Sequence, residues 1–190
     1  MVARSVLKLF IGFNRLMTRN IQKFIYFFWG MLLLPMGSAL ATDTIEICEL
    51  KAAFIYNFTL FVTWPKNNNY LRMCVLGEST YFPQMKTYEG RSVNGATIRI
   101  ERVTSADDAR GCQVLLIGES EQDQINSITK KLKDSPVLTI SESGNFSPDA
   151  VHILLTRHLD RMAFDINQTA AKASGLSFSF KLLKLARNVY

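Results

Sequence analysis

The sequence predicts an α/β fold in which a mixed, mainly parallel sheet is flanked by helices. The run Val114–Ile117 is apolar at every position, and Val137–Ile140 is apolar at all but one. Segments with a helical pattern separate such runs, and this alternation is typical of a parallel sheet covered on both faces. The 149 residues from Thr42 to Tyr190 are enough for one compact domain with a substantial core.

The first helix of this domain is expected at Leu50–Val62. Ala53, Phe54, Asn57, Phe58 and Phe61 follow the i, i+3, i+4 spacing of a helix face, and Trp64-Pro65 ends the pattern. The opposite face is also apolar, and Lys51 is almost its only charge. A helix that is apolar all round is usually buried on both sides. The alternative is a partly exposed face that binds another protein.

The middle of the chain alternates between strands and helices. Thr97–Val103 has the period of two of a half-exposed strand, whereas the helix at Glu121–Lys133 turns Ile125, Ile128 and Leu132 inward. In chain order we expect a strand at Leu71–Leu76, a short helix at Ser79–Tyr88, a turn at Asn94-Gly95, the strand at Thr97–Val103, a short helical connection at Ser105–Arg110, the strand at Val114–Ile117, the helix at Glu121–Lys133 and the strand at Val137–Ile140.

The last third predicts an antiparallel hairpin followed by helices. Val151–Leu155 and Met162–Ile166 flank the turn residues 157–160. Asn167 is a good cap for a short helix at Gln168–Ala173, and Gly175 is a typical stop. We then expect an extended segment at Leu176–Phe180 and a closing helix at Lys181–Arg187.

The first 41 residues have the pattern of a secretory signal peptide. Basic Arg19 and Lys23 precede the apolar run Phe24–Leu34, and Ala39-Leu40-Ala41 is an A-x-A cleavage site. The run is shorter than the roughly 20 residues that a spanning helix needs, although an uncleaved anchor is the alternative. We expect cleavage between Ala41 and Thr42, export to the periplasm, and a translation start at Met17, which gives a leader of ordinary length.

Most of the positive net charge of the chain lies in the predicted leader and not in the exported part. Residues 1–41 hold five of the 22 basic residues and none of the 16 acidic ones, so the remainder carries 17 basic against 16 acidic residues. Its net charge is close to zero rather than the +6 of the whole chain. A domain without a strong positive field is not expected to bind nucleic acid.

Three cysteines remain in the exported part, and an oxidising compartment favours disulfides. Cys74 and Cys112 each open an apolar segment, and matching ends of neighbouring strands can lie within the roughly 4.4–6.8 Å between Cα atoms that a bridge requires. Closing this loop removes about 3–4 kcal/mol of unfolded-state entropy. Cys48 is left as a packed free thiol or as one half of an intermolecular bridge.

Strand-to-helix turns of similar sequence occur three times. Gly77-Glu78-Ser79 recurs as Gly118-Glu119-Ser120, and Ser141-Glu142-Ser143 is a looser copy. In a parallel sheet all three turns lie at the carboxyl edge, where such folds form ligand clefts. A small-ligand cleft with Gly77, Ser79, Gly118, Ser120, Ser141 and Ser143 is therefore the binding hypothesis, and ordinary helix capping is the alternative. No P-loop and no dinucleotide fingerprint is present, and we expect no cofactor.

Candidate catalytic groups are scarce, and we expect no enzyme activity. His152 and His158 have no cysteine near them in the sequence, which makes a poor metal site. Asp107-Asp108 and the pair Asp160 and Asp165 are carboxylates that ordinarily face water. The sequence holds no G-x-S-x-G elbow and no C-x-x-C pair.

Several segments resemble the YfiR family of periplasmic proteins, to which HmsC also belongs. The resemblance covers essentially all of the exported part, in order. It is carried by Lys51–Phe58, Phe61–Pro65, Cys112–Leu115, Met162–Asn167, Ala170-Ala171, Gly175-Leu176 and Lys181–Arg187. It implies a compact, Rossmann-like α/β domain in which Cys74 and Cys112 form the structural disulfide of the family. The second cysteine pair of some members is absent here, so redox control through it is not expected.

The resemblance also implies a function. Members repress an inner-membrane diguanylate cyclase of the YfiN type by binding its periplasmic domain, which lowers cyclic-di-GMP and biofilm formation, and an outer-membrane lipoprotein relieves the repression. A homodimer is a further expectation.

We expect the partner surface in the C-terminal third, with Met162, Phe164, Asp165, Ile166, Leu182 and Leu185 as candidates. Alternation along Met162–Ile166 turns Asp165 outward, unless it only caps the helix that begins near Asn167.

Overall fold

The computed structural model describes residues 39–66, 68–142, 151–158 and 161–190. The chain divides into two compact units, residues 1–41 and residues 42–190. The expected leader up to residue 38, with the start at Met17, lies outside the described residues.

The first element is a long helix, α2 (Ala39–Phe61), and all but its first three residues belong to the second unit. Its start at Ala39 corrects the predicted start at Leu50, because residues 42–50 contain neither Gly nor Pro and the helix continues through them. Its end before Trp64-Pro65 agrees with the prediction. Ile55 and Phe58 are buried, whereas Leu50 and Leu60 are substantially exposed, so the helix is not buried all round. Within the described part of the chain, no helix is both long and apolar enough to cross a membrane.

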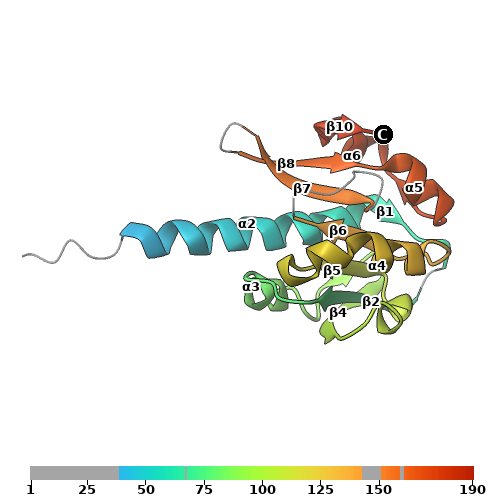
Figure 1. Ribbon diagram of the computed structural model, residues 1–190, viewed down its shortest axis with the longest axis horizontal. Helices are drawn as coiled ribbons and strands as arrows, with labels where there is room; N and C mark the ends of the chain where they lie inside the picture. Colours follow the sequence, from blue (N-terminus) through green and yellow to red (C-terminus); the bar gives the residue numbers. More distant parts are fainter. Residues whose placement is uncertain (1–38, 67, 143–150, 159–160) are drawn as a thin grey trace, which may run out of the picture. The chain divides into compact units, whose positions relative to one another are not determined.

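Eight strands form one sheet in the order β10-β8-β7-β6-β5-β2-β4-β3 (Figure 1). The five strands β4, β2, β5, β6 and β7 run parallel to one another, as predicted, and β8 pairs antiparallel with β7 as the predicted hairpin. At the ends of the order, β3 is antiparallel to β4 and β10 is parallel to β8. A separate two-stranded sheet pairs β1 with β9. The strands are β1 (Val62–Thr63), β2 (Tyr70–Leu76), β3 (Ser92–Val93), β4 (Ala96–Val103), β5 (Val114–Ile117), β6 (Leu138–Ser141), β7 (Ile153–His158), β8 (Arg161–Ile166), β9 (Ser177–Phe178) and β10 (Asn188–Val189).

The inner strands are apolar on both faces because each face covers its own core. In β5, Val114 and Leu116 pack in the core that includes α2, whereas Leu115 and Ile117 pack in the core on the opposite face. The second core also contains Ile128 of helix α4 (Ile125–Leu132). Uninterrupted apolar strands therefore indicated a doubly covered sheet correctly.

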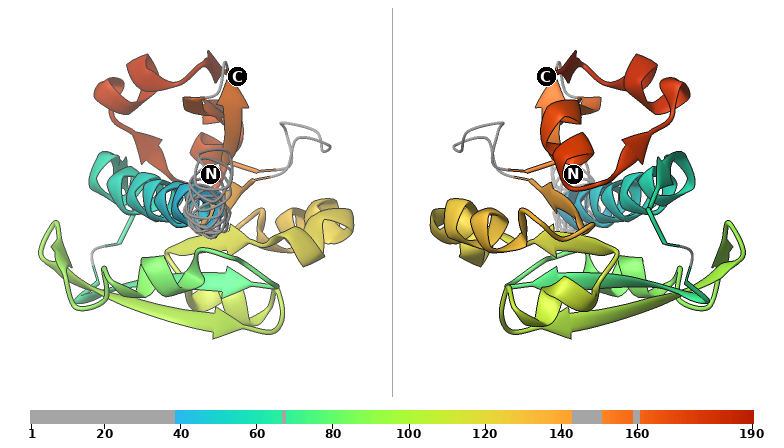
Figure 2. Two further views of the ribbon diagram at one scale, coloured as in Figure 1. Left: turned by 90° about the vertical axis from the view of Figure 1, so that its left-hand side faces the viewer. Right: turned by 90° about the vertical axis from the view of Figure 1, so that its right-hand side faces the viewer.

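The sheet curls around α2, which is seen nearly end-on in Figure 2. On one flank the ring of Phe58 meets that of Phe164 in β8, with centroids 4.9 Å apart. On the other flank Tyr56 stacks on Tyr88, which precedes β3 and β4, at 4.6 Å. One helix thus contacts both β8 and the turn before β3, which explains why its apolar side chains extend over more than one face.

The shorter helices lie close to their predicted positions. They are α3 (Phe82–Lys86), the 3-10 turns η1 (Asp108–Gly111) and η2 (Glu119–Gln124), α4, α5 (Gln168–Ala173) and α6 (Phe180–Leu185). Asn167 caps α5 by accepting a hydrogen bond from the backbone N–H of Ala170, and Gly175 follows with a positive φ of 76°. The closing helix begins one residue early and ends before Arg187, whose chain continues into β10, a strand that was not predicted.

Candidate functional site

The residues predicted to bind a partner do not form one exposed surface. Phe164, Ile166 and Leu182 are buried in the α2 core. Met162 is half-buried and packs against that core, whereas Leu185 on α6 is 68% exposed. Only Leu185 among these apolar side chains is freely available to another protein.

The predicted outward orientation of Asp165 is wrong. Its side chain is 4% exposed and receives two hydrogen bonds from Arg187, Nε to Oδ1 at 2.9 Å and Nη2 to Oδ2 at 2.5 Å. Asn188 Nδ2 donates to the same Oδ1 at 3.0 Å. The segment after α6 therefore covers the face of β8 that alternation alone assigned to solvent. Burial acts to raise the pKa of Asp165, but Arg187 outweighs it and holds the pKa below its ordinary value.

Sequence reasoning could not find these contacts, because Arg187 lies 22 residues from Asp165 and no local spacing links them. It also missed Phe180, the first residue of α6, which is 69% exposed. Phe180, Leu185, Val189 and Tyr190 are the exposed large apolar side chains of residues 180–190, and we name them the C-terminal apolar group. The signal available in the sequence was the number of apolar side chains in so short a terminal segment.

The Gly-Glu-Ser turns lie together at the carboxyl edge, as predicted, because β2, β5 and β6 are parallel neighbours. The first two turns also bind each other. The backbone N–H of Glu119 donates to the carbonyl of Glu78 at 3.1 Å, and the N–H of Glu78 donates to Ser120 Oγ at 3.0 Å. A Cβ added at Gly118 would lie 2.1 Å from the Glu78 carbonyl oxygen, so this position requires glycine.

The other residues proposed for the ligand cleft also do not line an open space. Gly77 has a φ of 82°, and a Cβ there would lie 2.5 Å from Ser120 Oγ. Ser79 Oγ and Ser141 Oγ are buried atoms, and Ser143 lies outside the described residues. The glycines therefore allow two turns to pack closely, and the space between them is filled by protein atoms.

A cavity of about 170 Å³ lies beside these turns and is bounded by charged side chains. Lys51 of α2 forms an ion pair with Glu142, and both side chains are largely buried. Burial raises the pKa of Glu142, although Lys51 opposes the shift. Glu119 also lines this cavity. Arg157 lines it as well, so two carboxylates face two cations and the lining has no net charge that would favour an anionic ligand.

Cys74 and Cys112 form a disulfide with their Cα atoms 6.1 Å apart, as the sequence predicted. Cys74 lies in β2, and Cys112 enters β5, the strand paired with it. Cys48 is a free, partly buried thiol on α2, 4.0 Å from Thr80 Oγ1. Among the described residues, Cys74, Glu101 and Cys112 have potential metal-ligand atoms within 4.8 Å of one another, but the two sulfurs are bonded to each other.

The other candidate catalytic groups stay apart. His158 is exposed at the end of β7, whereas His152, the residue just before β7 in the sequence, is buried. Asp107 pairs with Arg110 on the surface. Asp160 lies outside the described residues.

Comparison with known proteins agrees with this architecture. The chain is similar to a solved structure described as the ABC domain in complex with L-Trp from Streptococcus pneumonia, with a TM-score of 0.50 and 9% sequence identity. The match covers 75% of this chain and 60% of the other, so this chain spans less than two thirds of that protein. At such low identity the likeness shows an α/β fold alone.

The domain is thus a disulfide-bonded α/β protein with exposed apolar side chains near its end. A family profile described as YfiR/HmsC-like matches residues 48–187, which is most of the chain. The chain belongs to the YfiR/HmsC-like family, which confirms the resemblance of the sequence segments. This is a family of periplasmic regulators rather than enzymes.

Proposed function

We propose that this protein represses an inner-membrane diguanylate cyclase by binding the periplasmic domain of that enzyme. The observation that carries the proposal is the family match over residues 48–187. Repression by binding lowers cyclic-di-GMP and therefore biofilm and exopolysaccharide output. It requires an accessible surface and no catalytic chemistry in this chain.

The C-terminal apolar group supports the proposal. Phe180 and Leu185 are about two-thirds exposed, and α6 holds them on a short helix anchored by buried Leu182. Aromatic and aliphatic anchors supply most of the affinity in protein interfaces, and Lys184, whose Nζ lies 4.6 Å from the Phe180 ring centroid, adds a charged rim. We assign partner binding to this group in place of the buried Phe164, Asp165 and Ile166.

The geometry gives little support to the alternative of a small ligand at the Gly-Glu-Ser turns. The turns of Gly77 and Gly118 fill the space between them, and in the neighbouring cavity Glu119 and Glu142 are balanced by Lys51 and Arg157. Ligand binding there is not needed for repression.

Co-purification tests the proposal directly. The exported part of the chain, residues 42–190, is mixed with the isolated periplasmic domain of a cyclase from the same host. We expect a stable complex under oxidising conditions. Failure to bind any periplasmic domain of the membrane cyclases of that host would contradict the proposal.

Two further partners belong to the proposal. An outer-membrane lipoprotein that sequesters the regulator would compete with the cyclase, and self-association into a homodimer would set how many cyclase domains are bound. Competition binding and sedimentation of the purified chain test these two points.

A further inference from the structure

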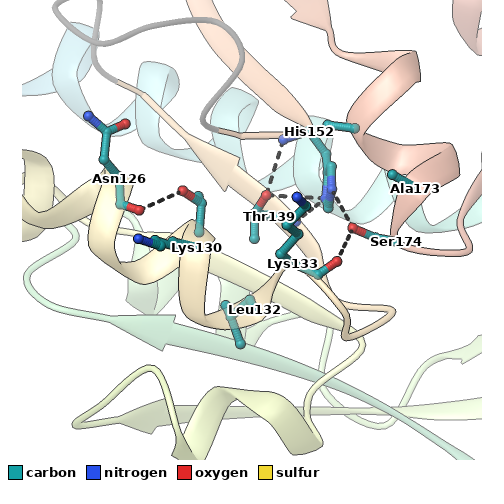
Figure 3. Close-up of a pocket in the computed structure, with 10 residues that line it drawn as sticks. Asn126, Lys130, Leu132, Lys133, Thr139, His152, Ala173 and Ser174 are labelled. Carbon is teal, nitrogen blue, oxygen red and sulfur yellow. Dashed lines mark hydrogen bonds between the residues drawn. The ribbon is translucent and has the colours of Figure 1, made fainter.

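A second cavity, of about 340 Å³, lies between α4 and α5 and is separate from both the C-terminal apolar group and the Gly-Glu-Ser turns. Figure 3 shows Asn126 and Lys130 at one end, Ala173 and Ser174 at the other, and Thr139 and Lys133 between them. Its size falls at the lower end of the roughly 300–1,000 Å³ typical of small-molecule sites. The lining residues are Asn126, Thr129, Lys130, Leu132, Lys133, Thr139, His152, Ala170, Ala173 and Ser174.

The charges around this cavity favour an anion. Lys130 and Lys133 line it, and none of the described lining residues is Asp or Glu. In the part of the chain that the structure describes, neither lysine is paired with a carboxylate. A ligand carrying negative charge would therefore meet two unpaired ammonium groups and no repelling carboxylate among the described residues of the wall.

The floor is a buried polar network that holds His152 neutral. The backbone N–H of Thr139 donates to His152 Nδ1 at 3.1 Å, which places the proton of the neutral ring on Nε2. Nε2 lies 3.2 Å from Ser174 Oγ, and the Ser174 hydroxyl donates to the carbonyl of Lys133 at 3.2 Å. Burial lowers the pKa of His152 to about 4, so the ring adds no charge at neutral pH. The network joins β6, the residue before β7 and the ends of α4 and α5 into one fixed base.

Small apolar side chains complete the wall. Leu132 is buried beneath the cavity, and Ala170 and Ala173 leave room on the α5 side. An organic skeleton can lie against these groups while its charges face the lysines, whereas a fully hydrated inorganic ion gains nothing from them. Two lysines match two charges on one ligand.

We propose that the cavity between α4 and α5 binds a small organic anion with two or more carboxylate groups. Lys130 and Lys133 neutralise the carboxylates, Asn126 donates hydrogen bonds at one end, and Leu132, Ala170 and Ala173 contact the carbon skeleton. The site is independent of cyclase repression, so it can be tested on the purified chain.

The competing explanation is that the lysines only balance the partial negative charge at the carboxyl end of α4. Lys131 lies in the same last turn but does not line the cavity, which makes it a matched control. Both explanations predict similar small losses of helix stability for Lys130→Gln, Lys131→Gln and Lys133→Gln. Only a ligand site predicts that Lys131 differs from the other two in binding.

Isothermal titration of residues 42–190 with succinate and with citrate, at constant ionic strength, tests the site. We expect saturable binding of at least one of them at one site per chain, and none of neutral 1,4-butanediol. The double variant Lys130→Gln/Lys133→Gln should weaken binding at least tenfold, and Lys131→Gln should stay within twofold of the wild type. Ala173→Leu, which fills the cavity without changing its charge, should also weaken binding at least tenfold.

Three results would overturn the proposal. The first is no saturable binding of either carboxylate, and the second is an equal effect of the Lys131 and Lys130/Lys133 variants. The third is inorganic phosphate binding as tightly as citrate. That result would mean that the cavity recognises only the negative charge of the ligand and not its carbon skeleton. Thermal unfolding of each variant confirms that it is folded before it is titrated.

Discussion

Asp165 and Arg187 join β8 to the segment after α6 through a largely buried ion pair. Asp165 is 4% exposed, and the side chain of Arg187 is 35% exposed. Removing one partner of such a pair leaves a buried charge without compensation, which costs more than the pair itself contributes. The pair therefore fixes where the C-terminal residues lie.

We predict that Asp165→Asn lowers the free energy of unfolding by about 1–3 kcal/mol, because the hydrogen bonds to Arg187 lose their charge. Urea unfolding followed by circular dichroism measures this loss. The control is Asp107→Asn, which breaks the exposed pair with Arg110 and should cost less than about 1 kcal/mol. Equal effects of the two substitutions would contradict the structural role of Asp165. Asp165→Lys should destabilise further, since it places a second cation beside Arg187.

His152 makes stability depend on pH. Its pKa is about 4 in the folded domain and 6.5 in the unfolded chain, so between these values the unfolded chain holds a proton that the folded one does not. The free energy of unfolding therefore falls as pH decreases through this window, by up to about 3 kcal/mol from this residue. Glu142, whose pKa is raised, acts in the opposite sense as pH rises above its ordinary value.

Because the effects of His152 and Glu142 on stability overlap in pH, the contribution of His152 is measured by comparing variants with the wild type. His152→Gln should flatten the fall in stability between pH 6.5 and 4, whereas His158→Gln, at an exposed position, should leave it unchanged. An NMR titration of the wild-type His152 ring gives the same answer without a substitution. A ring that titrates near 6.5 would contradict the neutral network of Thr139, His152 and Ser174.

At the scale of elements, the disulfide ties β2 to the entrance of β5 across a sequence separation of 38 residues. Chain-entropy arguments give about 4 kcal/mol for a loop of this length. We predict that Cys74→Ser lowers the free energy of unfolding by about 2–5 kcal/mol. Denatured, oxidised wild type should show one free thiol per chain, that of Cys48, and three free thiols would contradict the bridge.

The C-terminal apolar group can be tested without disturbing the fold. Phe180 and Leu185 are exposed, so Phe180→Ser/Leu185→Ser should change stability by less than about 1 kcal/mol, since surface substitutions usually change it by only a few tenths each. The same variant should weaken binding of the cyclase periplasmic domain at least tenfold in a pull-down or titration.

Leu50→Ser is the matched control for this variant, because Leu50 is an exposed apolar residue on α2. It should bind the cyclase domain like the wild type. If the double variant also bound normally, the partner surface would lie elsewhere on the domain.

At the scale of the whole molecule, the sequence predicted the sheet better than the surface. The apolar run Val114–Ile117 reports burial on both faces, so strands and parallel pairing could be derived from local pattern. The orientation of Asp165 could not, because the group that buries it comes from β10 and Arg187, and a two-residue strand has no pattern of its own. The start of α2 was missed for a different reason, since hydrophobic periodicity marks the buried part of a helix and not its exposed extension.

The candidate sites, too, could be predicted from the sequence only in part. Parallel pairing predicted that the turns of Gly77 and Gly118 lie together, but only the structure shows that they fill each other's space. The cavity between α4 and α5 brings together His152, Ser174 and Lys133 from segments up to 41 residues apart, which no spacing in the sequence could indicate.

The most direct measurement of the central proposal is the intracellular level of cyclic-di-GMP in the host after deletion of this gene. We predict a rise that is reversed by the wild-type chain and absent when the partner cyclase gene is deleted as well. Phe180→Ser/Leu185→Ser should fail to reverse the rise, and Leu50→Ser should reverse it. An unchanged level of cyclic-di-GMP in a strain that expresses the cyclase would contradict repression by this protein.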